Sequence, residues 1–407
     1  MTSSQGSPGH GDWDDDDLSV EQKAWINGLD RRLHELWGLG RNLILVWSPS
    51  DVGMDVLVLP HYSISEHAQR AREEMERFAS SALGIQPTSF IEEVIANPKH
   101  VTPDGLNHLA RLVEAEPLSV PLDFAPGRDL DFELIETVVK RYSISSYVED
   151  RAVALFDIVG FSLLSPLEQV TQLNSLAHSV NSAFSKLLDK RIDINFARTT
   201  TGDGFYIWNR DRTVQANVNL YNFMHLVLAD NAIARSKSKT NVAPLLRACF
   251  HIGGHYEFYQ SEGLSPTVYS YIVGDVTIEL ARMIDRALPG QVLVGDFLVP
   301  MPDRDTGLAT RIDSVEFIER TQKSLSALQG MELSGEEIQD IRCYLTGDKR
   351  EDGDYGIKKY LIADKHGRTR NVFNAKINIY RTAGDPIFLG AQTSELGLFK
   401  TESEEFV

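Results

Sequence analysis

The chain contains few cysteines and no long apolar run. Two cysteines, Cys249 and Cys343, occur among 407 residues, without metal-ligand spacing or the density of a disulfide scaffold. This scarcity predicts a reduced, cytoplasmic protein. No apolar run approaches the roughly 20 residues that a membrane helix needs, so we expect no membrane partner. The N-terminus is acidic and polar, which does not fit a signal peptide.

Basic residues are also scarce relative to acidic ones. Asp and Glu outnumber Lys and Arg by 58 to 40, and the formal net charge is -18. We expect no nucleic-acid partner, because no broad basic surface is available for phosphate contacts. A bound polyphosphate would need metal ions and a few well-placed cations. The length and the 42% share of hydrophobic residues allow two or three domains with a large core.

Composition and periodicity divide the chain into four segments. Residues 1–20 predict a disordered acidic tail. Residues 21–130 predict an α/β segment of unknown role, with a helix at 65–83 and a proline-rich linker at 117–126. The strongest pattern lies in residues 131–300, which predict the catalytic domain. Residues 301–407 predict an extension with a helix and a β-hairpin.

Two acidic motifs stand out in the third segment. The apolar run 151–156 predicts a strand that ends at Asp157, in the sequence FDIVGFS. Asp203 lies in the sequence TGDG, which predicts a tight hairpin between strands at 192–201 and 205–208. Ser165 followed by proline predicts the start of a helix. An apolar stripe follows it at spacings of three and four, formed by Val170, Leu173, Ala177, Val180, Phe184 and Leu187.

The remaining pattern predicts alternating helices and strands. We expect helices at 213–236, 276–287 and 314–330, and strands at 246–252, 291–294, 358–363 and 371–380. The last two strands are joined by a turn that begins at Asp364.

The two carboxylates suggest a metal and triphosphate site. Gly160 follows Asp157 closely, and glycine lets the backbone approach a phosphate. Carboxylates at such a position suit Mg²⁺ or Mn²⁺. With Asp203, a two-metal site would form, in which one ion lowers the pKa of an attacking hydroxyl and the other neutralises a leaving polyphosphate. Each motif alone is more often a structural loop or an Asx-capped turn. Their order and context favour the metal site.

Three blocks of the sequence resemble the class III nucleotide cyclases. They lie in the family's order at residues 156–162, at 201–204, and at 273–275 with 280–283 and 289–294. The resemblance covers roughly residues 148–300. It implies an α/β (α+β) fold, a palm-like domain with an antiparallel-rich sheet flanked by helices. It also implies a homodimer with active sites at the interface.

The same resemblance implies roles for individual residues. The 3′-hydroxyl of a nucleoside triphosphate would attack its own α-phosphate and release pyrophosphate. Asp157, Asp203 and the backbone of Ile158 would hold two Mn²⁺ or Mg²⁺ ions per active site. Arg282 would stabilise the transition state from the other subunit, although alone it would be interpreted as a salt-bridge residue on a helix. Further substrate contacts would come from the loop formed by Gly160, Phe161 and Ser162.

The base-reading positions differ from those of purine cyclases. Tyr271 replaces the family's Asp, Ile278 its Asn and Thr199 its Lys. Either the domain has lost activity and only binds nucleotide, or it reads another base. Tyr271 would shrink the pocket and favour a pyrimidine, and Arg198 would donate to O2 or O4. On a strand, Arg198 shares a face with Asp203 only if a bulge intervenes, so Thr199 is the in-register alternative.

This combination is similar to the bacterial pyrimidine cyclases of the Pycsar antiphage systems. The similarity implies conversion of UTP to cyclic UMP, or of CTP to cyclic CMP, and a separate effector that the cyclic nucleotide activates. An arginine donor suits both O4 and O2 of uracil, which favours UTP and a uridylate cyclase, although cytosine also carries O2 and CTP stays open. A purine cyclase with an unusual pocket and a degenerate nucleotide-binding module are the alternatives.

Overall fold

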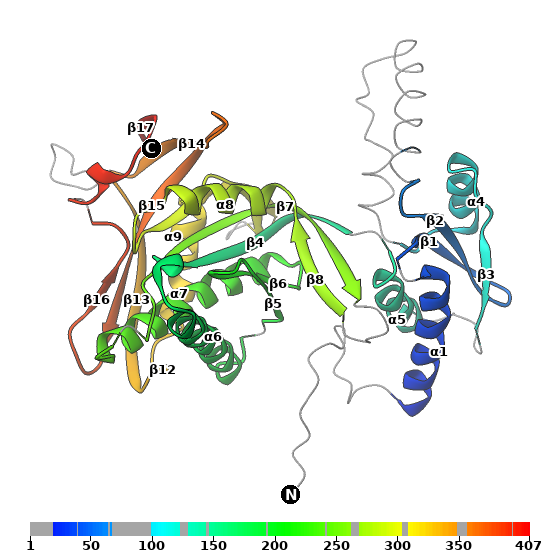
Figure 1. Ribbon diagram of the computed structural model, residues 1–407, viewed down its shortest axis with the longest axis horizontal. Coiled ribbons are helices and arrows are strands. Elements are labelled where there is room, and N and C mark those ends of the chain that lie inside the picture. The colour runs from blue at the N-terminus through cyan, green and yellow to red at the C-terminus, as the bar shows by residue number, and fades with distance from the viewer. Residues whose placement is uncertain are drawn as a thin grey trace, which may run out of the picture. The chain divides into compact units, whose positions relative to one another are not determined.

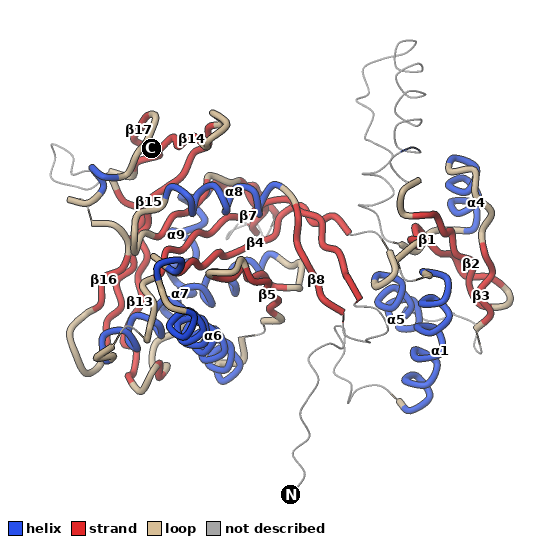
Figure 2. The backbone as a smooth tube through the Cα atoms, viewed as in Figure 1, coloured by secondary structure: helices blue, strands red, loops and turns tan. Residues whose placement is uncertain are grey.

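The computed structural model describes residues 19–38, 40–63, 66, 99–122, 129–143, 146–192, 194–240, 242–261, 268–302, 308–347, 356–392 and 394–407. The predicted acidic tail up to residue 18, nearly all of the predicted helix at 65–83 and residues 123–126 of the predicted linker lie outside this set. The chain forms two compact units: Met1–Val148 with Tyr256–Val273, and Glu149–His255 with Gly274–Val407. Both combine helices and strands, which confirms the predicted α/β (α+β) class (Figure 2).

The first unit contains a small antiparallel sheet with helices on both faces. Its elements are α1 (Val20–Trp37), β1 (Asn42–Ser50), β2 (Gly53–Pro60), α4 (Pro103–Leu112), β3 (Leu118–Pro121) and α5 (Asp129–Lys140). The unit also includes β8 (Val268–Val273), which is outside the small sheet and pairs with Tyr256–Ser261. The sheet order is β1-β2-β3. Trp47 and Met54 pack with α1 and α5, whereas Leu45 and Leu57 pack with α4. Along β2 this division follows from the alternation of side chains on a strand. On β1 the register shifts between Ile44 and Val46, which puts Leu45 and Trp47 on opposite faces.

The second unit is built on a long, mostly antiparallel sheet (Figure 1). Its strands are β4 (Ser146–Ile158), β5 (Phe196–Thr200), β6 (Gly204–Asn209), β7 (Leu246–Ser261), β9 (Val292–Gly295), β12 (Glu332–Leu333), β13 (Glu336–Thr346), β14 (Lys358–Ala363), β15 (Thr369–Arg381), β16 (Ile387–Leu389) and β17 (Ser403–Phe406). The main path runs β12-β13-β15-β9-β7-β4-β6-β5. A separate two-stranded sheet contains β10 (Leu298–Pro302) and β11 (Ala309–Asp313).

Helices cover both faces of this sheet. They are α6 (Pro166–Asp189), α7 (Val214–Lys237), α8 (Asp275–Arg286) and α9 (Ser314–Ser326), with 3-10 turns at Phe161–Leu163 and Leu396–Leu398. Residues of α6, α7 and α9 share one core with inward-facing strand residues such as Phe156 and Ile207. On the opposite face, Tyr206 donates a hydrogen bond to the carbonyl of Thr277 in α8 (3.2 Å). Figure 1 shows α8 and α6 on opposite sides of β4 and β7.

The predicted helix after Ser165 is confirmed. Ser165 caps it, and Glu168 completes a capping box. The predicted apolar stripe holds at Val180 and Leu187, which are fully buried, but not at Val170, which is 49% exposed. The first turn of α6 projects beyond the core, so the inward-facing positions start with Gln172.

The segment after residue 300 continues the central sheet. The predicted strand at 358–363 coincides with β14, and β15 extends the predicted strand at both ends. β15 pairs with β9 on one edge and with β13 on the other. The sequence boundary at residue 300 therefore does not appear as a break in the second unit.

Candidate active site

Asp157 and Asp203 meet at one end of the sheet. Asp157 lies near the end of β4, opposite Gly204 of β6. The amide of Ile158 donates to the carbonyl of Asp203 (3.0 Å), which fixes the β5–β6 turn against the end of β4. Only glycine fits at position 204, because a Cβ there would lie 1.8 Å from the carbonyl oxygen of Phe156. Gly202 supplies the positive φ of 101° that the turn requires.

Arg247, at the start of β7, contacts the same carboxylate. Its Nε and Nη2 donate to Oδ2 of Asp157 at 2.8 and 2.5 Å. Sequence reasoning missed this residue. The available signal was a single cation inside an apolar run, since buried arginines are normally paired. Its partner is 90 positions away in the chain, which local patterns do not reveal.

The electrostatics favour a bound cation at this point. Burial raises the pKa of Asp157, the hydrogen bonds and charge of Arg247 lower it, and the neighbouring Asp203 raises it again. The net shift is upward. Two carboxylates with one arginine leave an excess of negative charge, which a metal ion would neutralise.

The donor set fits Mg²⁺ or Mn²⁺. These ions bind through one or two carboxylates and complete their coordination with waters and substrate phosphates. In the part of the chain that the structure describes, no group of three or more His, Cys, Asp or Glu side chains could hold a metal ion. The site therefore fits an ion shared with a phosphorylated substrate better than an ion held by protein ligands alone.

The loop after Asp157 is short and ordered by its own hydrogen bonds. Gly160 has a φ of 71°, and its carbonyl accepts from the amide of Leu163 (2.9 Å). The carbonyl of Phe161 accepts from the side chain of Gln169 (3.1 Å), while the Phe161 ring packs against the core. Ser162 is exposed. The roles of Gly160, Phe161 and Ser162 as substrate contacts stay predictions.

The predicted base-reading residues lie on different faces. The pairing of β5 with β6 is continuous, so the bulge that would bring Arg198 to the Asp157 face is absent from this strand pair. Thr199 lies opposite Tyr206, on the Asp157 face. The guanidinium of Arg198 lies 5.3 Å from the ring centroid of Phe205, on the sheet face that α6 and α7 cover. Tyr271 belongs to β8, in the first compact unit. Their contacts to a base stay predictions.

Arg282 lies on α8 and pairs with Asp364, in the turn between β14 and β15. Arg370 of β15 approaches the same Asp364 oxygen (3.7 Å) and also pairs with Glu279 of α8 (2.8 Å). Among the described ion pairs, Arg282 has none with Asp157 or Asp203. Ile278, at the position of the family's Asn, is 44% exposed on the same helix.

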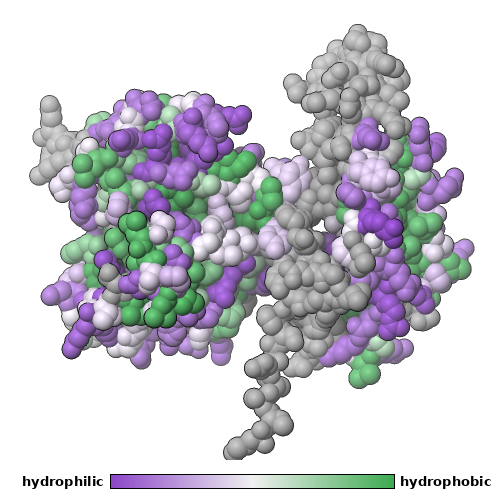
Figure 3. Space-filling view, viewed as in Figure 1, coloured by the Kyte–Doolittle hydropathy of each residue, from purple (hydrophilic) through white to green (hydrophobic). Residues whose placement is uncertain are grey.

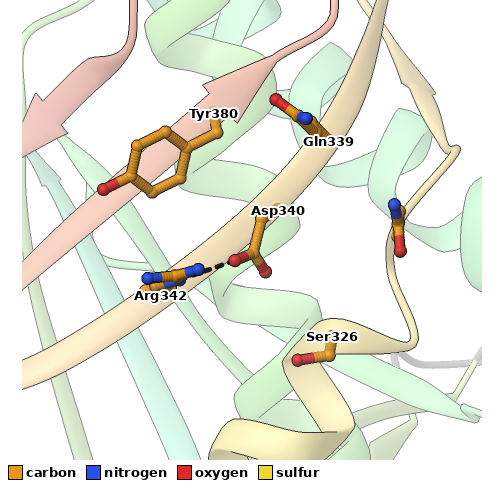
Figure 4. Close-up of a pocket in the computed structure, with 6 residues that line it drawn as sticks. Ser326, Gln339, Asp340, Arg342 and Tyr380 are labelled. Carbon is orange, nitrogen blue, oxygen red and sulfur yellow. Dashed lines mark hydrogen bonds and ion pairs between the residues drawn. The ribbon is translucent and has the colours of Figure 1, made fainter.

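A polar cavity that includes none of these residues is shown in Figure 4. Its volume is about 470 Å³, and it is lined by Ser326, Gln329, Gln339, Asp340, Arg342 and Tyr380. Asp340 pairs with Arg342 at 2.6 Å, and the guanidinium lies 5.5 Å from the Tyr380 ring centroid. Its lining holds one carboxylate, which the arginine already neutralises, so it lacks the charge excess of the Asp157 site.

No helix among the described residues combines the length and apolar composition that crossing a bilayer requires.

Comparisons with known proteins gave matches among solved structures only. No protein-family model matches the chain, and no curated protein does. The guanylyl cyclase Cya2 matches with 12% identity and a TM-score of 0.34, over 57% of this chain and 93% of that one. The adenylyl cyclase CyaB from P. aeruginosa matches with 12% identity and a TM-score of 0.34, over 59% and 98%. The guanylate cyclase domain of RhGC from Catenaria anguillulae, in complex with GTP, matches with 15% identity and a TM-score of 0.30, over 42% and 96%. Similarity this low supports neither a family assignment nor an activity.

Proposed function

We propose that this protein is a class III-type nucleotide cyclase. It converts a pyrimidine nucleoside triphosphate, UTP or CTP, into the 3′,5′-cyclic monophosphate and pyrophosphate. The observation that carries the proposal is the meeting of Asp157 and Asp203 beside Arg247. Two motifs that are separate in sequence form one acidic site at the end of a sheet, as a metal-dependent reaction on a triphosphate requires.

Asp157, Asp203 and the backbone of Ile158 would hold two Mn²⁺ or Mg²⁺ ions. When bound, the ions would activate the 3′-hydroxyl and neutralise the departing pyrophosphate. Arg247 lowers the pKa of Asp157, which favours the ionised carboxylate that a metal ion binds. The Gly160–Ser162 loop follows directly and would place backbone amides near the polyphosphate.

The proposal includes a homodimer, which the position of Arg282 supports. The reaction needs a cation at the α-phosphate. Within its own chain, Arg282 of α8 is paired with Asp364, in the turn between β14 and β15. A second copy of the chain would supply its Arg282 to the Asp157 site. An apolar surface is available near the metal loop, since Leu163 and Leu167 are 89% and 75% exposed. Figure 3 shows green surface over this part of the second unit.

Base choice rests on the substituted pocket positions. Tyr271 would fill space that a purine needs, and Thr199, on the Asp157 face, would contact the pyrimidine. The cyclic nucleotide would act as the signal of an antiphage system and activate a separate effector.

Both cysteines are free thiols, which supports a reducing, cytoplasmic setting.

The test is incubation of the purified protein with Mn²⁺ or Mg²⁺ and each of the four ribonucleoside triphosphates separately. We expect cyclic UMP or cyclic CMP, with no product in the Asp157→Ala or Asp203→Ala variants. Cyclic AMP or cyclic GMP as the main product would refute the pyrimidine assignment. Metal-dependent nucleotide binding without any cyclic product would refute the enzyme assignment.

A further inference from the structure

An alternating row of charges joins α8 to the C-terminal hairpin β14–β15. Glu279 and Arg282 come from α8, one helical turn apart, while Asp364 and Arg370 come from the hairpin. The order in space is Glu279, Arg370, Asp364 and Arg282, so each charge faces one of opposite sign. The side chains of Asp364 and Arg370 are only 6% and 8% exposed, which makes this a partly desolvated network rather than a surface pair.

Backbone hydrogen bonds of the hairpin turn fix the Asp364 side chain independently of the two arginines. Its Oδ1 accepts hydrogen bonds from the amides of His366 (2.7 Å) and Arg368 (3.0 Å), which close the hairpin turn. Its Oδ2 is the atom that faces Arg282 and Arg370. The carboxylate therefore offers one oxygen in a fixed position, and that position is set by the turn.

Arg282 is anchored through one nitrogen only. Its Nη1 pairs with Asp364, while Nε and Nη2 have no hydrogen bond to any acceptor in the described residues. The side chain is 23% exposed. A guanidinium that is fixed at one end and has donors left over is pre-oriented to bind an oxyanion.

We propose that Asp364, with Arg370 beside it, is a positioning residue that orients Arg282 for catalysis. The C-terminal hairpin then belongs to the catalytic apparatus, although it lies outside the region of resemblance to the cyclases. This inference rests on the proposed function, because it assigns the oxyanion to the transferred α-phosphate. Without Asp364, Arg282 and Arg370 would repel each other, and Arg282 would lose its orientation.

The test compares Asp364→Asn with the wild type, using the triphosphate that the wild type cyclises. We expect kcat to fall roughly 10- to 100-fold, the size typical when a residue that orients a functional group is lost. KM should change by no more than about twofold, because the interaction is made in the transition state. Asp364→Glu should restore part of the rate, which a merely structural role would not require.

Two comparisons separate positioning from general damage. Glu404→Gln removes the 2.7 Å ion pair between Glu404 of β17 and Lys358 of β14, and should leave kcat unchanged. Asp364→Asn should add no further loss in an Arg282→Ala background, because its effect acts through Arg282. If Asp364→Asn does not fold, as judged by its melting curve, Arg370→Gln takes its place. It should lower kcat less, since the Asp364 contact remains.

The outcomes distinguish this inference from the proposed function. A folded Asp364→Asn variant with unchanged or higher kcat, in an active wild-type background, overturns the positioning role alone. A wild type that cyclises no nucleotide overturns the proposed function and the inference with it. An additional loss in the Arg282→Ala background shows that Asp364 acts through another group, which also overturns the inference.

Discussion

Two arginine–aspartate pairs in the second unit are closely alike in burial. The side chains of Asp157 and Asp364 are 9% and 6% exposed, and those of their partners Arg247 and Arg282 are 26% and 23% exposed. Their surroundings differ. Asp157 has a second carboxylate, Asp203, as its neighbour, whereas Asp364 has a second arginine and two backbone amides.

The difference shows that the local balance of charge, not the pair itself, decides which partner acts. Around Asp157 the excess is negative, so the carboxylates are available to a metal ion and Arg247 moderates them. Asp364 faces two arginines, one of which also pairs with Glu279, so its carboxylate is engaged in holding cations while Arg282 keeps donors that Asp364 does not use. In the proposed reaction, the aspartate of the first pair would bind metal, whereas the arginine of the second pair would bind the phosphate.

The largest expected effect comes from removing a carboxylate at the negative cluster. Asp157→Ala or Asp203→Ala should lower turnover by at least about 10²–10³-fold, the loss expected when a group that stabilises transition-state charge is removed. Product formation with Mn²⁺ measures this, and the melting curve should show an intact fold. Full activity in both variants would remove the basis for treating this cluster as the functional one.

The two clusters should respond oppositely in stability when the carboxylate is neutralised. The pKa of Asp157 is raised in the folded protein, so the folded state loses stability as pH rises from the unfolded pKa through the folded one. At pH values above the folded pKa, the wild type has lost this contribution completely. Asparagine does not ionise, so Asp157→Asn should be at least as stable as the wild type at pH 7.5, with the advantage shrinking in acid.

Asp364→Asn should instead lower the free energy of unfolding, on the order of 1–3 kcal/mol, because the charged contacts of Asp364 are lost and Arg282 loses its ion-pair partner. Denaturant unfolding of both variants at pH 7.5 and 4.5 would show the contrast. Equal losses in both would mean that Asp157 is a structural ion-pair residue like Asp364.

The sequence was sufficient for features with a local cause. Asp157 and Asp203 are marked by an apolar run, by glycines and by a hairpin turn, and the structure brings them together as those signals indicate. The turn at Asp364 was predicted as well, and Gly367 has the positive φ of 74° that such a turn needs. Each of these depends on residues within a few positions of one another.

Contacts between distant segments could not be predicted. Arg247 pairs with Asp157, and Asp364 pairs with Arg282, although the two members of each pair are far apart in the chain. The neighbouring residues in the sequence do not indicate these partners. Strand β7 was predicted to end at Gly253, yet it continues to Ser261. The continuation is held by β8, with which Tyr256–Ser261 of β7 pair, and local sequence does not reveal this partner.

A smaller effect is expected from removing the arginine of the negative cluster. Arg247 lowers the pKa of Asp157, so Arg247→Met should raise that pKa further. The acid limb of the kcat/KM profile should move to higher pH, because metal binding needs the ionised carboxylate. Arg235→Met, which removes an exposed arginine on α7, is the matched control. An unmoved acid limb would show that Arg247 does not moderate Asp157.

The smallest effect is expected at a third arginine–aspartate pair, in the cavity of Figure 4. Asp340 and Arg342 lie at 2.6 Å, but the arginine is 52% exposed and the other cavity residues carry no charge. With neither excess carboxylate nor excess cation, the pair is screened by solvent. Asp340→Asn should leave kcat unchanged and lower the melting temperature less than Asp364→Asn does. A loss of turnover from Asp340→Asn would contradict the rule drawn from the other two pairs, because a neutral, exposed pair would then be functional.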